Sequence, residues 1–150
     1  MFIVRSVLAI VAGIFVGGLL IGVIELGGHR ILPPPAELSD LMRSGTPEDL
    51  AKARDILASA SPVVFLPVLL AFAIGPLVGG MVAAMISRNA KLAHALAIGL
   101  FFTIANIFNV LSVPQPLWVS VVSFLIFLPA ALGGGILAQR LQSVPKSSVI

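Results

Sequence analysis

The sequence predicts an all-α polytopic membrane protein with four transmembrane helices and a long first loop that contains a short amphipathic helix. Two observations lead to this fold class. Apolar residues make up 59% of the 150 residues and charged residues only 10%, whereas a soluble domain carries about 25% charged residues. Four apolar stretches of about 20 residues follow one another, each long enough to cross a bilayer as a helix. The length suits one domain that covers residues 1–150.

The composition also argues against several classes of protein. No cysteine is present, so the chain has no disulfide, no thiolate nucleophile and no cysteine metal ligand. The net charge of +3 comes from Lys and Arg residues near the ends of segments, without the basic patch that nucleic-acid binding requires. We therefore expect the lipid bilayer, and no nucleic acid, as a partner.

The predicted spans cover residues 6–28, 62–87, 92–112 and 117–138. The first span is longer than the apolar core of a signal peptide and has no convincing cleavage site, so we expect it to be retained. The turns SRNAK and VPQP, which join the last three spans, are very short. Consecutive helices joined by such turns are antiparallel neighbours.

The segment between the first two spans is long and holds five of the six acids. Thr46, followed by Pro47 and then by Asp49 three positions after the cap, is typical of a helix N-terminus. One face of this helix carries four apolar residues, Leu50, Ala53, Leu57 and Ala60. The pattern predicts a helix over residues 47–59 that lies on the membrane or caps the bundle. The alternative is a solvated connector.

Basic residues in short loops mark the cytoplasmic side of a membrane protein. Five of them lie on the side of the two termini: Arg5, Arg88, Lys91, Arg140 and Lys146. Four lie in the long first loop among the acids: Arg30, Arg43, Lys52 and Arg54. This small excess predicts a multi-pass protein with both termini in the cytoplasm.

Small residues at four-residue spacing allow membrane helices to approach closely. The first span has two such pairs, Gly13 with Gly17 and Gly18 with Gly22, and the second span has Gly75 with Gly79. We expect packing of helices, within the bundle or between protomers, at Gly18, Gly22, Gly75 and Gly79.

Glu25 is the only acid inside the predicted spans, about one turn before the end of the first. At 100° per residue it shares an arc of about 60° with Gly18, Gly22 and His29, so we expect this face to point into the bundle. His29 follows four positions later and can contact it. A protonated His29 favours ionised Glu25 and burial favours the neutral form, and the sequence does not decide between them.

The third span supplies polar side chains at about the same depth. Asn106 and Asn109 lie one to two turns from its outer end, and the Asn106 carboxamide could donate a hydrogen bond to Glu25. The predicted polar or ion site therefore consists of Glu25, His29, Asn106 and Asn109. Trp118, just after the VPQP turn, is predicted to be an interfacial anchor.

Three interpretations of this site remain open. In the first, its contacts hold the first span against the third. In the second, Glu25 is the titrating group of a proton- or cation-coupled transporter, a common role for acids inside membranes. In the third, the site binds a metal or is catalytic, but Glu25 and His29 supply two ligands where catalytic zinc uses three, and His94 lies near the opposite face. We expect no metal, no cofactor and no enzymatic activity.

Two motifs, ELGGHRILPPP at residues 25–35 and PQPLW at residues 114–118, together with the pair Gly79 and Gly80, resemble small bacterial four-helix integral membrane proteins of uncharacterised function. The resemblance covers nearly the whole chain, and it implies a location in the bacterial cytoplasmic membrane and no activity. Gln115 stands where that group has a second histidine, which weakens a two-histidine metal site. A looser resemblance is to small four-helix multidrug transporters, which carry a glutamate in the first helix and work as dimers.

These observations together predict a structural or accessory subunit of a membrane assembly, either a homo-oligomer or part of a larger complex. The alternative is a small oligomeric proton- or cation-coupled transporter that uses Glu25.

Overall fold

The structure is a computed structural model and describes residues 2–143. These residues form six α-helices and one 3₁₀ helix and no strand: α1 (Phe2–Ile31), α2 (Glu37–Ser44), α3 (Pro47–Ser59), η1 (Pro62–Phe65), α4 (Leu66–Ile86), α5 (Lys91–Ser112) and α6 (Leu117–Ser143). Four helical segments are long and apolar enough to cross a membrane, namely α1, η1 with α4, α5 and α6. The all-α fold with four candidate membrane spans is therefore confirmed.

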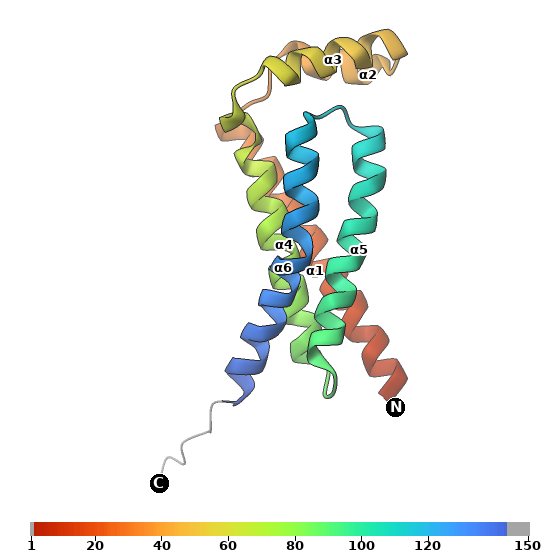
Figure 1. The fold of residues 1–150 in the computed structure, drawn as a ribbon, viewed down its shortest axis with the longest axis vertical. Helices are drawn as coiled ribbons and strands as arrows, with labels where there is room; N and C mark the ends of the chain where they lie inside the picture. Colours follow the sequence, from red (N-terminus) through yellow and green to blue (C-terminus); the bar gives the residue numbers. More distant parts are fainter. Residues whose placement is uncertain (1, 144–150) are drawn as a thin grey trace.

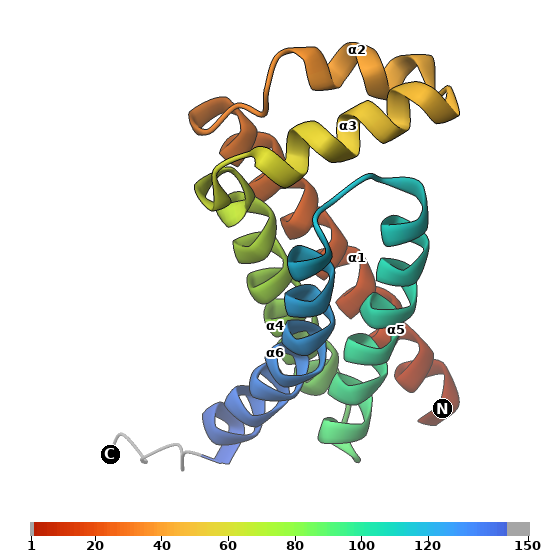
Figure 2. The same ribbon diagram turned by 45° about the horizontal axis from the view of Figure 1, so that its top comes forward.

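The four long helices run side by side along the long axis of the molecule (Figure 1). Helices α2 and α3 lie across one end of this bundle, next to each other (Figure 2). We call these two helices the cap hairpin and the end of the bundle that they cover the capped end. The start of α1, the turn between α4 and α5, and the end of α6 lie at the other end, which we call the terminal end.

Helix α1 extends beyond its predicted range of 6–28 at both ends, and α6 continues five residues beyond 138. Apolar runs mark the part of a helix that crosses a membrane, whereas the helix itself continues through polar residues that favour it. Helix α1 ends before the prolines at 33–35, which cannot continue a helix because they lack a backbone N–H.

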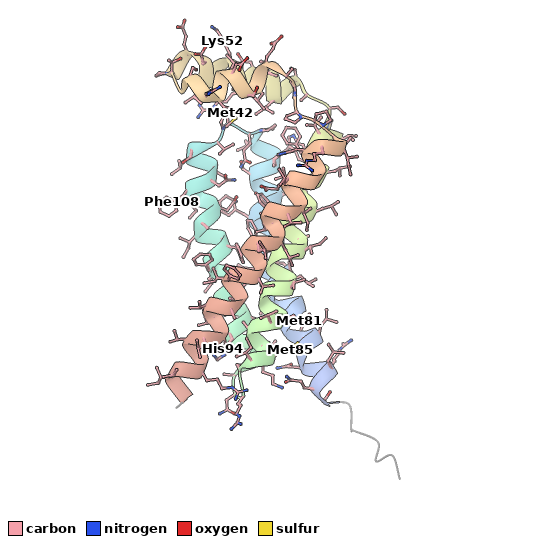
Figure 3. All side chains as sticks on the ribbon, turned by 180° about the vertical axis from the view of Figure 1, so that it is seen from behind. Met42, Lys52, Met81, Met85, His94 and Phe108 are labelled. Carbon is pink, nitrogen blue, oxygen red and sulfur yellow. The ribbon has the colours of Figure 1, made fainter. Side chains whose placement is uncertain are left out.

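The connection between α1 and α4 contains two helices, and α2 was not predicted. Helix α2 ends at Gly45, whose φ of 65° is in the left-handed region that glycine adopts without strain. Helix α3 begins after Thr46, whose Oγ1 accepts a hydrogen bond from the Asp49 backbone N–H at 3.2 Å. Leu38 of α2 and Leu57 of α3 are buried against Phe65 of η1, so the apolar side of the cap hairpin faces the bundle. Figure 3 shows Met42 on that side and Lys52 on the opposite side.

Glycines determine how closely α1 and α4 pack. A Cβ atom at Gly79 would lie 2.6 Å from the backbone oxygen of Gly13, and one at Gly75 would lie 2.8 Å from that of Gly17. Such distances are too short for any other residue, so the two helices pack backbone to backbone at these positions.

The second glycine pair of α1 is different from what we expected. A Cβ atom at Gly18 or Gly22 would meet nothing within 4 Å, so neither residue packs against another of the described helices. Successive residues of a helix point about 100° apart, so Gly18 cannot share the face of Gly17 that meets α4. The expectation that the face of Gly18 and Gly22 points into the bundle is therefore wrong for these two glycines.

Aromatic side chains fill the middle of the bundle. The ring of Phe127 lies 5.1 Å from that of Phe72 and 6.3 Å from that of Phe102, centroid to centroid. Buried Ile98 and Ala83 extend this cluster. The outer surface is also apolar, with Phe15, Phe108 and Leu125 each more than 60% exposed, as lipid-facing positions would be.

Candidate functional site

Two cavities in the capped half of the molecule are lined by Glu25. The first, of about 350 Å³, lies between the cap hairpin and the bundle, and we call it the cap cavity. Most of its lining is apolar; its polar residues are Glu25, His29, Ser39, Asn109 and Gln115. The second, of about 190 Å³, lies among the long helices, and we call it the helix cavity. Its lining residues are Ile21, Glu25, Phe72, Phe102, Ala105, Asn106, Asn109 and Phe127.

Glu25 lies where the two cavities meet. It lines both of them, as do Phe72 and Asn109. Its side chain is half-buried, and within residues 2–143 its carboxylate has neither a hydrogen bond nor an ion pair, since the single salt bridge found there joins Lys52 to Asp49. A carboxylate held away from bulk water without a partner is unfavourable, so a proton or a cation in the cavities would stabilise it.

His29 lies one turn beyond Glu25 on α1. It lines the cap cavity and is otherwise exposed, at the level where the chain leaves the bundle for the cap hairpin. Of the four predicted site residues, Glu25, His29 and Asn109 thus line the cap cavity, and Glu25, Asn106 and Asn109 line the helix cavity.

Asn106 is 3% exposed and makes one hydrogen bond, from its Nδ2 to the Oγ of Ser123 on α6 at 3.2 Å. The orientation of the amide follows from the neighbouring bonds. The Ser123 hydroxyl lies 2.9 Å from the backbone oxygens of Val119 and Ser120. Backbone oxygens only accept hydrogen bonds, so the hydroxyl hydrogen of Ser123 is donated to them. Its Oγ must therefore accept from Asn106. The Asn106 Oδ1 is buried and has no hydrogen-bond partner among residues 2–143.

This arrangement differs from the hydrogen bond that we expected between Asn106 and Glu25. The two residues line the same cavity, but the Asn106 amide hydrogen is donated to α6 and not to α1. The physical reason is that α5 packs closely on α6 and only loosely on α1. Depth along a span is readable from sequence, whereas the identity of the facing helix is not.

Several polar residues near the cavities were not singled out in the sequence. Ser120 and Ser123 lie three positions apart on α6, and both are buried. The Gln115 side chain, from the turn before α6, donates to the Ser120 Oγ at 3.0 Å. The Ser-x-x-Ser spacing within an apolar span was the available signal, because it places two hydroxyls on one helix face.

Trp118 is 41% exposed and packs edge-on against Phe65, with the ring centroids 5.5 Å apart and the planes at 85°. Phe65 in turn lines the cap cavity. The indole is therefore in contact with a wall of the cap cavity while one side remains open to the surroundings.

The chemistry that this site offers is binding through acceptor oxygens. Among residues 2–143, no three His, Asp or Glu side chains converge as metal ligands would. The free polar atoms of the helix cavity include the Glu25 carboxylate and the Asn106 Oδ1, both of them acceptors. A proton, a cation or a group with N–H donors complements such a site.

No family model, curated protein or solved structure matches this chain.

Proposed function

We propose that this chain is a small transport protein of the bacterial cytoplasmic membrane that binds a cation or a proton at Glu25. The observation that carries the proposal is the unpartnered Glu25 carboxylate at the junction of two cavities. A structural role for Glu25 would need a protein group that holds it, and the expected one, the Asn106 amide, is bonded to Ser123 instead. Acids inside membrane spans commonly serve transport.

The rest of the bundle supports access of the occupant to Glu25 from the capped end. Beneath the helix cavity, toward the terminal end, Ile98, Ala83 and the glycine contacts between α1 and α4 fill the interior. Above Glu25, the cap cavity lies under the short cap hairpin, whose buried residues Leu38, Ala53 and Leu57 form a cluster with Phe65 and Val119. A cation that enters beneath the cap hairpin would thus reach Glu25 and stop at the packed half.

The charge distribution supports termini in the cytoplasm and the cap hairpin on the outer membrane surface. Among residues 2–143, the terminal end carries Arg5, Arg88, Lys91 and Arg140, and no acid. Lys146, the fifth basic residue of the predicted cytoplasmic side, lies outside the described residues. The five acids outside the spans all lie in the cap hairpin, beside four basic residues at positions 30–54.

Proton movement in liposomes tests this function. The purified protein would be reconstituted with a pH-sensitive dye inside, and gradients of alkali-metal ions and alkylammonium ions would be imposed in turn. We expect at least one cation to drive proton movement in the native protein and none to do so in Glu25→Gln. Glu37→Gln, which removes an exposed acid outside both cavities, is the matched control and should behave as native. If no cation of the panel drives proton movement in the native protein, the proposal is contradicted.

A second candidate is an accessory subunit of a larger membrane assembly. The observation that favours it is the exposed Gly18 and Gly22 face of α1, which packs on no other helix within residues 2–143 and has the spacing of a helix contact. Purification under mild solubilisation distinguishes the two: a single co-purifying partner supports the accessory subunit, and a pure homo-oligomer supports the transporter.

A further inference from the structure

A separate cavity, of about 140 Å³, lies at the terminal end, far from Glu25. Every residue that lines it is polar or charged: Arg5 and Ser6 of α1, and Ser87, Arg88 and Asn89 of the turn between α4 and α5. We call it the terminal cavity. Figure 3 shows Met85 and His94, which flank this turn, at that end of the bundle.

Among residues 2–143, the two arginines of the terminal cavity have no acidic side chain as a partner. All six Asp and Glu residues of the chain lie between positions 25 and 55, and none follows. These positions belong to the capped end of α1 and to the cap hairpin, at the opposite end of the bundle. The charges of Arg5 and Arg88 are therefore not neutralised by any carboxylate side chain of the protein.

Two side chains of the terminal cavity, Arg5 and Ser87, make hydrogen bonds to the end of α4. The Arg5 Nε donates to the backbone oxygen of Ile86 at 2.6 Å, one of the last carbonyls of α4, which have no partner inside their own helix. Ser87 is 4% exposed, and its hydroxyl makes only a long contact of 3.4 Å with the Ala84 oxygen. Arg5 thus lines the same cavity as a buried hydroxyl whose single hydrogen bond is long.

Two guanidinium groups, two hydroxyls and one carboxamide form a set of donors that suits a tetrahedral oxyanion. Guanidinium groups bind phosphate through paired N–H donors, and hydroxyls and amides add further donors. The terminal cavity lies where α1 begins and α4 ends, which is the level of lipid headgroups for helices that cross a bilayer. Basic pockets between spans at this level bind anionic headgroups.

We propose that the terminal cavity binds the phosphate group of an anionic phospholipid through Arg5 and Arg88. A phosphate could also come from solution as inorganic phosphate. The position at the helix ends favours the lipid, whose acyl chains run along the apolar outer faces of α1 and α4. This site is independent of Glu25 and of the transport proposal.

Native mass spectrometry of the full chain, released from detergent with added lipid, tests this site. The protein should retain phosphatidylglycerol in preference to phosphatidylcholine, whose ammonium group the two arginines repel. Arg88→Gln should lower the retained fraction about fivefold, which corresponds to about 1 kcal/mol for one basic residue at an anionic surface. Arg140→Gln is the matched control, because it removes the same charge from the terminal end without lining the cavity.

Two further arms complete the test. Arg5→Gln should also lower the fraction of lipid that the protein retains. Thermal unfolding of each variant shows whether it is folded. If Arg5→Gln is unfolded, the result for Arg88→Gln decides whether the site exists. Excess inorganic phosphate should leave the lipid in place, since it lacks the acyl chains. Equal retention by native, Arg88→Gln and Arg140→Gln proteins would overturn the site, and so would equal losses in the two variants. Displacement of the lipid by inorganic phosphate would overturn the lipid as the source.

Discussion

Asn106 of α5 and Ser123 of α6 are joined by a hydrogen bond of 3.2 Å inside the bundle, and this bond leaves the Asn106 Oδ1 without a partner. A buried acceptor without a donor costs stability. In this chain the acceptor belongs to a residue that lines the same cavity as Glu25. A cation site that is empty needs acceptor groups that are free to bind the cation. The cavity has two such groups, the amide oxygen of Asn106 and the carboxylate of Glu25.

Replacing Asn106 by leucine should separate stability from binding. The substitution removes a hydrogen bond worth about 1 kcal/mol but also removes the unpaired acceptor, so the free energy of unfolding should change by less than about 1 kcal/mol. Cation affinity should fall about tenfold or more, because one bond to a charged group is lost. Thermal unfolding in detergent and cation titration measure the two effects. A strongly destabilised variant with native affinity would show that Asn106 only joins helices.

The two glycine pairs should respond in opposite ways to alanine. Gly79→Ala places a Cβ atom 2.6 Å from the Gly13 oxygen, so α1 must move away from α4 at a cost of about 1–3 kcal/mol. Gly18→Ala meets nothing, and the better helix propensity of alanine should leave stability equal or slightly higher. Thermal unfolding in detergent compares them. Equal melting temperatures for the two variants would contradict the packing of α1 on α4 described above.

Low pH should destabilise the first turn of α3. The hydroxyls of Ser44 and Thr46 donate to the Asp49 carboxylate at 2.6 and 2.8 Å and hold its pKa below the ordinary value. A carboxyl with a lowered pKa contributes stability above the ordinary value of about 3.9, and this stability is lost as the pH falls through the lower value of the folded state. Hydrogen exchange of the first amides of α3, corrected for its intrinsic pH dependence, should show this loss.

Asp55, an exposed acid on the same helix, provides the control for that measurement. Asp49→Asn should weaken protection at neutral pH and remove most of the pH dependence, whereas Asp55→Asn should retain it. An unchanged profile in Asp49→Asn would mean that these hydroxyl bonds do not stabilise the cap hairpin.

The fluorescence of Trp118 should respond both to its position at the membrane interface and to the occupancy of the cap cavity. It is the single tryptophan of the chain, so all indole fluorescence comes from one position. Lipids brominated near the glycerol backbone should quench it more than lipids brominated at the chain ends, as for an interfacial anchor. Because the indole contacts Phe65, which lines the cap cavity, a cation that fills this cavity should also shift the emission. Strongest quenching by chain-end bromine would contradict the interfacial position.

The parts of this fold that local sequence specifies could be predicted. Each span is a continuous apolar run, so its presence needs no knowledge of the other helices. Thr46 caps α3 through a bond that reaches only three residues along the chain. Helix α2 was not predicted because its sequence is mostly polar and contains no apolar run. Its order depends on the burial of Leu38 against residues of other elements.

The contacts within the candidate site could be predicted only in part. Glu25, Asn106 and Asn109 have matching depths that follow from counting turns, and the structure brings all three to one cavity. Whether Asn106 donates to Glu25 or to Ser123 depends on which helix α5 faces, and that depends on the packing of the whole bundle. The same holds for the glycines, since two pairs at the same spacing were present in α1 and only Gly13 and Gly17 meet α4.

The most direct test of a cation and proton site at Glu25 is infrared difference spectroscopy of the reconstituted protein before and after addition of the cation found in the liposome panel. Glu25 is the only Asp or Glu within the four candidate spans, so the carboxyl band of a protonated acid inside the bundle has one assignment. We expect this band to disappear when the cation binds and to be absent throughout in Glu25→Gln. A carboxyl band that is unchanged by the cation, or a cation-induced change that persists in Glu25→Gln, would contradict the account.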